Sequence, residues 1–206
     1  MKKKLSALLS VVAILVVMGL SGCSFLESKL NSFKGSLVGV SYTADFYDNY
    51  GAQFFTASGD KIDIDGNYVD DGYDTEGNIT SSLSSVITIT IDGKEIEACG
   101  NTVIFEEKGL SPDIEFSLTD VESDSSGLSG LTSISKVINK FKNYFGKSRV
   151  VVIQSQLGVP IRAYSGDDIY WEIPDDLPKM TKLMIDGKAL YIHRANFEII
   201  DTELIK

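Results

Sequence analysis

The chain has 206 residues, a formal net charge of −10 and a single histidine. Its acidic surface would repel the phosphates of nucleic acids, so the sequence predicts no nucleic-acid partner. The length fits one domain of ordinary size that can bury a real core.

The first 22 residues have the three parts of a secretory signal. Three lysines at positions 2 to 4 precede an apolar run from Leu5 to Leu20, and small residues follow before Cys23. As a helix this run would reach about 24 Å, which is shorter than the roughly 30 Å hydrocarbon core of a bilayer. We therefore expect a lipoprotein-type signal peptide at residues 1–22, with an uncleaved membrane anchor as the alternative.

The segment Leu20-Ser21-Gly22-Cys23 resembles the lipobox of bacterial lipoproteins. The resemblance implies that a signal peptidase cuts before Cys23 and that the Cys23 thiol carries a diacylglyceryl group. Two acyl chains are enough for stable anchoring. The expected location is therefore the extracytoplasmic face of the cell membrane.

Removal of the leader would change the charge and the cysteine content of the mature chain. The leader holds three of the 19 basic residues and none of the 29 acidic ones, so residues 23–206 carry a formal net charge of −13. With Cys23 lipidated, Cys99 is the only free thiol. We expect a buried structural thiol at Cys99, with a reactive or intermolecular cysteine as the alternative.

The rest of the chain divides into a tether and one domain. Residues 23–35 have apolar side chains at near-helical spacing and are expected to form a membrane-proximal tether or short helix. Residues 36–206 are expected to form a single β-rich domain, because apolar and polar residues alternate. Asp-Gly pairs at 65–66, 92–93 and 186–187 favour tight hairpin turns. Further strands are expected at 102–106, 114–121, 149–154, 159–164, 169–173 and 196–200.

A Ser/Gly-rich connection at 123–130 precedes a predicted helix at 131–146. Apolar side chains recur there at three- and four-residue steps, and Gly146 ends the pattern. Such a wide apolar stripe is covered most simply by a sheet. The predicted fold class is mainly β, as an antiparallel sandwich or a bent sheet, with one major amphipathic helix. An α+β fold is the alternative.

Three short motifs stand beside the β pattern: Gly51-Ala52-Gln53-Phe54, Thr56-Ala57-Ser58-Gly59-Asp60 and Gly158-Val159-Pro160-Ile161. In these the domain is similar to an uncharacterised family of bacterial lipoproteins with a domain of unknown function. The motifs are not chemically specific. The resemblance therefore implies no activity and no site residues.

The acidic stretch from Asp60 to Glu76 is the first candidate site. Carboxylate and amide oxygens are calcium ligands, and those proposed here are Asp63, Asp65, Asn67, Asp70 and Asp74. The first three match positions 1, 3 and 5 of an EF-hand loop, but Tyr68 stands where that loop requires glycine. A solvated acidic hairpin without metal is the alternative, and no other cofactor is expected.

Two further candidate sites are surface patches. Tyr164, Tyr170 and Glu172 are expected to face outward and to bind the sugar rings of an envelope polymer. The alternative is ordinary cross-strand tyrosine pairs with Trp171 in the core. The other patch consists of the basic residues Lys136, Lys140 and Lys147, in a stretch without acids. It would contact anionic lipid or another polyanion, or else be a solvated helix face.

The sequence offers little evidence for a catalytic site. His193 lies in an alternating run without a nucleophile motif, which favours a structural histidine. We expect a membrane-anchored lipoprotein that serves as a non-catalytic binding or interaction module of the cell envelope. Its expected partners are membrane lipid through Cys23 and an envelope polymer or protein. The alternative is an enzyme that acts on envelope polymers through carboxylates or a bound calcium ion.

Overall fold

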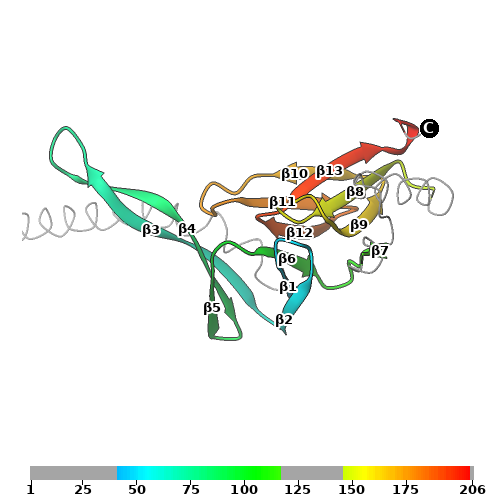
Figure 1. Cartoon of the computed structure of the whole chain (residues 1–206), viewed down its shortest axis with the longest axis horizontal. Helices are drawn as coiled ribbons and strands as arrows, with labels where there is room; N and C mark the ends of the chain where they lie inside the picture. The colour runs from blue at the N-terminus through cyan, green and yellow to red at the C-terminus, as the bar shows by residue number, and fades with distance from the viewer. Residues whose placement is uncertain (1–40, 117–145, 205–206) are drawn as a thin grey trace, which may run out of the picture. The chain divides into compact units, whose positions relative to one another are not determined.

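The computed structural model describes residues 41–116 and 146–204 (Figure 1). All described residues belong to one compact unit, Gly39–Lys206. Their elements are β1 (Tyr42–Tyr47), β2 (Gln53–Gly59), β3 (Ile62–Tyr73), β4 (Ile79–Ile91), β5 (Lys94–Ala98), β6 (Thr102–Glu107), β7 (Ile114–Glu115), β8 (Arg149–Gln154), β9 (Pro160–Gly166), β10 (Ile169–Glu172), β11 (Met180–Ile185), β12 (Lys188–His193), β13 (Asn196–Asp201) and the 3-10 turn η1 (Thr202–Leu204).

These strands form three sheets. A six-stranded sheet has the order β10-β11-β12-β6-β1-β2, a four-stranded sheet has the order β13-β8-β9-β7, and a three-stranded sheet has the order β3-β4-β5. Every pair of neighbouring strands is antiparallel. The prediction of a β-rich, antiparallel domain is confirmed.

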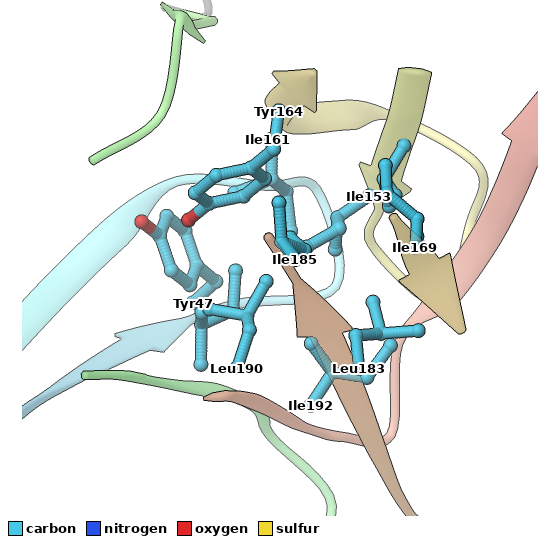
Figure 2. Packing of buried hydrophobic residues seen from close by; sticks show 11 residues of the cluster. Tyr47, Ile153, Ile161, Tyr164, Ile169, Leu183, Ile185, Leu190 and Ile192 are labelled. Carbon is cyan, nitrogen blue, oxygen red and sulfur yellow. The ribbon is translucent and has the colours of Figure 1, made fainter. Parts of the chain in front are cut away.

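One apolar core holds the six-stranded and four-stranded sheets together, as in a β-sandwich (Figure 2). Side chains alternate between the faces of each strand, so every second residue points into this core. On β8, for example, Val151 and Ile153 belong to the core, while Val150 and Val152 belong to a second buried cluster. Both faces of β8 are therefore buried, which explains its uninterrupted run of β-branched residues.

The predicted fold class included one major amphipathic helix, and this part of the prediction is wrong. The described part of the chain contains no α-helix, and its only helical element is the 3-10 turn η1. The reason is periodicity: the described strands alternate with period two, whereas the helix was predicted from a 3.6-residue period at 131–146. Apart from Gly146, that segment lies outside the described residues, as do residues 1–22, 23–35 and 123–130. No helix in the described ranges is long and apolar enough to cross a membrane.

Two of the three Asp-Gly pairs form the predicted hairpin turns. Asp92, Gly93, Asp186 and Gly187 all have positive φ, as a two-residue type I′ turn requires. The third pair lies inside β3, and the turn of that hairpin follows Asp74 instead. Gly66 serves close packing and not a turn, because a Cβ there would clash with the Asp176 carbonyl oxygen.

Candidate functional site

A hollow lies where the outer strands of the two core sheets meet. Strand β10 is the last strand of the six-stranded sheet, and β13 is the last strand of the four-stranded sheet. The hollow has a volume of about 440 Å³, and its lining residues come from β8, β10, β13 and η1. They are Arg149, Ile169, Tyr170, Trp171, Ile199, Asp201 and Leu204.

Trp171 is the most prominent apolar group of this hollow. It pairs with Leu183 on β11, so it lies on the same sheet face as the core residue Ile169, two positions earlier. Because β10 is an outer strand, Trp171 is not enclosed by further strands and is 58% exposed. An exposed tryptophan that forms part of a concave surface is well suited to binding a ligand.

Two charged residues lie on neighbouring strands of the same hollow. Arg149 and Asp201 are cross-strand partners in β8 and β13. The Arg149 guanidinium donates to the Ile169 carbonyl oxygen at 2.9 Å, and one Asp201 oxygen accepts the Glu203 backbone N–H at 3.0 Å. These bonds fix both side chains and leave further guanidinium donors and carboxylate lone pairs for a ligand.

Only one of the three aromatic-patch residues predicted from the sequence lines the hollow. Tyr170 does, and it is partly exposed. Tyr164 is buried, and its hydroxyl donates to Glu106 at 2.7 Å. Glu172 is exposed but pairs with Lys182 at 2.9 Å. Trp171, which the alternative placed in the core, lies on the core-facing side of β10 but is open to solvent.

A buried charge cluster lies between the sheets. Arg162 on β9 is 5% exposed, and its guanidinium lies 2.8 Å from an Asp45 carboxylate oxygen. Glu115 and Glu106 lie 3.2 Å and 3.7 Å from the same guanidinium. Burial raises the pKa of Glu106, against the lowering effect of its hydrogen bond from Tyr164. This cluster was not predicted from the sequence. The feature that could have indicated it is an aspartate and an arginine within apolar strand segments.

Tyrosine rings border the same end of the core. Figure 2 shows the hydroxyl groups of Tyr47 and Tyr164 together at one side of the apolar cluster. The Arg162 guanidinium carbon lies 5.7 Å from the centre of the Tyr47 ring, which is within range of a cation–π contact. Glu106 also lines a surface hollow of about 410 Å³ together with Asp60 and Glu107.

The predicted calcium ligands do not converge on one point. Asp63 pairs with Lys61, the Asn67 amide donates to Thr88, and Asp70 accepts from Ser81. Asp74 instead caps the distal turn, where it accepts from the Asn78 backbone N–H at 2.9 Å. The described residues include no group of three or more histidines, cysteines or carboxylates placed to hold a metal ion.

The structure describes only one of the three residues of the predicted basic patch. Lys147 forms ion pairs with Asp167 at 2.7 Å and with Asp186 at 2.9 Å. Its charge is therefore matched by two carboxylates of its own chain. Lys136 and Lys140 lie outside the described residues.

Cys99 and the single histidine have opposite environments. Cys99 is exposed, so the expected buried thiol is a wrong prediction: it follows the last residue of β5, where the chain returns to the surface. His193 is 1% exposed, and neither ring nitrogen has a hydrogen-bond partner among the described residues. Burial lowers the pKa of His193 to about 4.

Comparison with known proteins yields one match. No curated protein and no solved structure is similar to the chain. A family model described as a domain of unknown function, DUF5052, matches residues 3–205, which is nearly the whole chain. The protein therefore belongs to the DUF5052 family.

Proposed function

We propose that this protein is a lipid-anchored, extracytoplasmic binding module of the cell envelope. The lipobox-like leader supports the anchor, and the exposed Trp171 in the hollow between β10 and β13 is the observation that carries the binding role. A ligand would bind at the outer strands of the sandwich without any change in its core.

The lining favours a saccharide as the ligand. The flat face of Trp171 can cover the C–H face of a sugar ring, which is apolar, and Tyr170 also lines the hollow. Arg149 and Asp201 offer a donor and an acceptor for hydroxyl groups, and both are held by bonds within the chain. Sugar polymers of the envelope are the saccharides nearest to a protein anchored through Cys23.

The proposed anchor makes a prediction about the mature N-terminus. We expect mass spectrometry of the purified protein to find a chain that begins at Cys23 and carries a diacylglyceryl group. Replacing Cys23 with alanine removes the acceptor thiol, so the variant should keep its leader and lack the lipid. An intact Met1 or an unmodified Cys23 in the unsubstituted protein would contradict the anchor.

Ligand binding at the hollow should be visible in the fluorescence of Trp171. Trp171 is the only tryptophan of the chain, so the emission reports this hollow alone. Titration with soluble peptidoglycan and cell-wall polysaccharide fragments is expected to shift the emission to shorter wavelength and to protect it from acrylamide, because a bound sugar excludes water from the ring.

Calorimetry on variants provides the control for this titration. Replacing Trp171 with alanine should weaken binding roughly tenfold or more, as for the central aromatic group of an interface. Replacing Tyr50, an exposed tyrosine of the turn between β1 and β2, should leave affinity unchanged. If no fragment perturbs Trp171, or if both variants lose affinity equally, the saccharide proposal fails.

The enzyme alternative would need a carboxyl group with a raised pKa, and burial raises the pKa of both Glu106 and Glu198. Glu106 has a raised pKa and lines a hollow, as a general acid would. Its carboxylate, however, already accepts from Tyr164 and faces Arg162 between the two sheets. We therefore assign Glu106 to the stability of the sandwich rather than to catalysis.

A further inference from the structure

The β3–β4 hairpin continues beyond its third strand as a two-stranded ribbon (Figure 1). Strand β5 pairs with β4 only from Ile87 to Ile91. Residues 67–85, which we call the arm, therefore have neither a third strand nor any other paired edge in the described part of the chain. Two-stranded ribbons are marginally stable in water by themselves, so the side chains of the arm matter.

Register places the large apolar residues of the arm on one face. Tyr68 pairs with Leu83, and Tyr73 pairs with Ile79. The register shifts between Asp70 and Gly72, and this irregularity keeps Tyr73 on the same face as Tyr68. We call this set the arm face: Tyr68, Tyr73, Ile79 and Leu83.

The opposite face of the arm is mainly polar. Ser82 and Thr80 donate hydroxyl hydrogen bonds to Asp71, which lowers the pKa of that carboxyl. Val69 pairs with Ser82 and is the one large apolar residue on this side. The arm therefore has two chemically different faces, and it offers a matched position for a control substitution.

The arm face continues the buried face of the hairpin base. At the base, Ile64 pairs with Ile89, and Ile62 and Ile87 lie on the same face; all four are almost fully buried. A Cβ placed on Gly66 would lie 2.8 Å from the Leu83 side chain, so Leu83 adjoins the base. The same strands thus carry one apolar face, which is covered at the base and open along the arm.

Three of the four residues of the arm face are largely exposed to solvent. Tyr68 is 61% exposed, Ile79 is 60% exposed and Tyr73 is 75% exposed. Single exposed apolar residues are ordinary, but several on one face of one ribbon indicate an interaction surface.

The charge of the hairpin indicates what kind of partner covers this face. Residues 62–93 include seven acidic side chains and no lysine or arginine. A second copy would bring like charges together, and an anionic membrane would be repelled. Lysine or arginine around an apolar patch would complement the arm.

We propose that the arm face is a docking surface for a partner protein whose contact patch is apolar and bordered by lysine or arginine. This role is separate from the Trp171 hollow and from the lipid anchor. The arm supplies tyrosines as contact groups, and its carboxylates orient the partner and speed its encounter.

The test uses the full-length chain in mild detergent and a labelled synthetic peptide of alternating leucine and lysine. Fluorescence anisotropy should show saturable binding that weakens with salt. The matched peptide of leucine and glutamate should not bind. Replacing Tyr68, Tyr73 and Ile79 together with serine should lower affinity roughly tenfold or more. The Val69→Ser variant, on the opposite face, should bind as the unsubstituted protein does.

Two further measurements keep the result decisive. Circular dichroism must show that the triple variant keeps its sheets, and hydrogen exchange must show protection of arm amides by the peptide. Equal loss of affinity in both variants, or no protection of the arm, would overturn the proposal. A self-association abolished by the triple variant would assign the face to a second copy instead. Binding to anionic vesicles through this face would assign it to lipid.

Discussion

Replacing Arg162 with methionine is expected to lower the free energy of unfolding by about 3–5 kcal/mol, the usual loss when one partner of a buried ion pair is removed. The loss of stability comes from the partner carboxylate that remains in the variant. Asp45 is 4% exposed and would stay buried without its guanidinium partner. Hydrogen bonds from Thr56 at 2.7 Å and Gln53 at 3.0 Å hold Asp45 in place, so it cannot turn toward water.

Chemical denaturation of paired variants separates this effect from a loss of packing. The double variant Arg162→Met, Asp45→Leu removes both charges and should recover much of the lost stability, because apolar residues can replace a buried pair. The Lys61→Met variant breaks an exposed pair with Asp63 and should leave the unfolding midpoint nearly unchanged. If Arg162→Met is as mild as Lys61→Met, the cluster does not stabilise the sandwich.

Local patterns of sequence were enough to locate most of the sandwich strands. The alternation in Leu190-Tyr191-Ile192 predicts a strand with two faces, and β12 has Leu190 and Ile192 in the core cluster. Asp92-Gly93 predicts a hairpin turn, because both residues must adopt positive φ there and the flanking strands pair directly. Such features depend only on neighbours in the chain.

The candidate site depends on strand order, which local patterns do not determine. Trp171 occupies an inward-facing position, and the sequence cannot show that β10 is an outer strand that leaves it open. Arg162 and Asp45 are 117 residues apart, so their pairing follows from the stacking of two sheets. Asp65-Gly66 failed as a turn for the same reason, since a distant backbone at Asp176 requires glycine there.

The second large effect is a loss of stability in acid that comes from His193. The unfolded imidazole takes up its proton near pH 6.5, whereas the buried one resists until about pH 4. Between these values the unfolded state binds more protons, so the free energy of unfolding falls as the pH falls through this window. The full contribution is present above pH 6.5, and the loss reaches about 3 kcal/mol below pH 4.

The His193→Leu variant isolates this effect. Unfolding by urea at several pH values should give a shallower decline for the variant between pH 6.5 and 4, because the neutral side chain cannot be protonated. Burial also raises the pKa of Glu106, but this residue is present in both proteins and its effect cancels in the difference. Parallel curves for the two proteins would contradict the assignment.

A direct titration of the His193 imidazole tests whether burial lowers its pKa, independently of any change in stability. The chain contains one histidine, so the imidazole ring gives a single set of proton resonances in a nuclear magnetic resonance spectrum. Its midpoint should lie near pH 4 in the folded protein and near 6.5 in urea. A folded midpoint close to 6.5 would mean that water reaches His193 between β12 and its neighbours. The acid sensitivity of the domain would then have to come from its carboxylates.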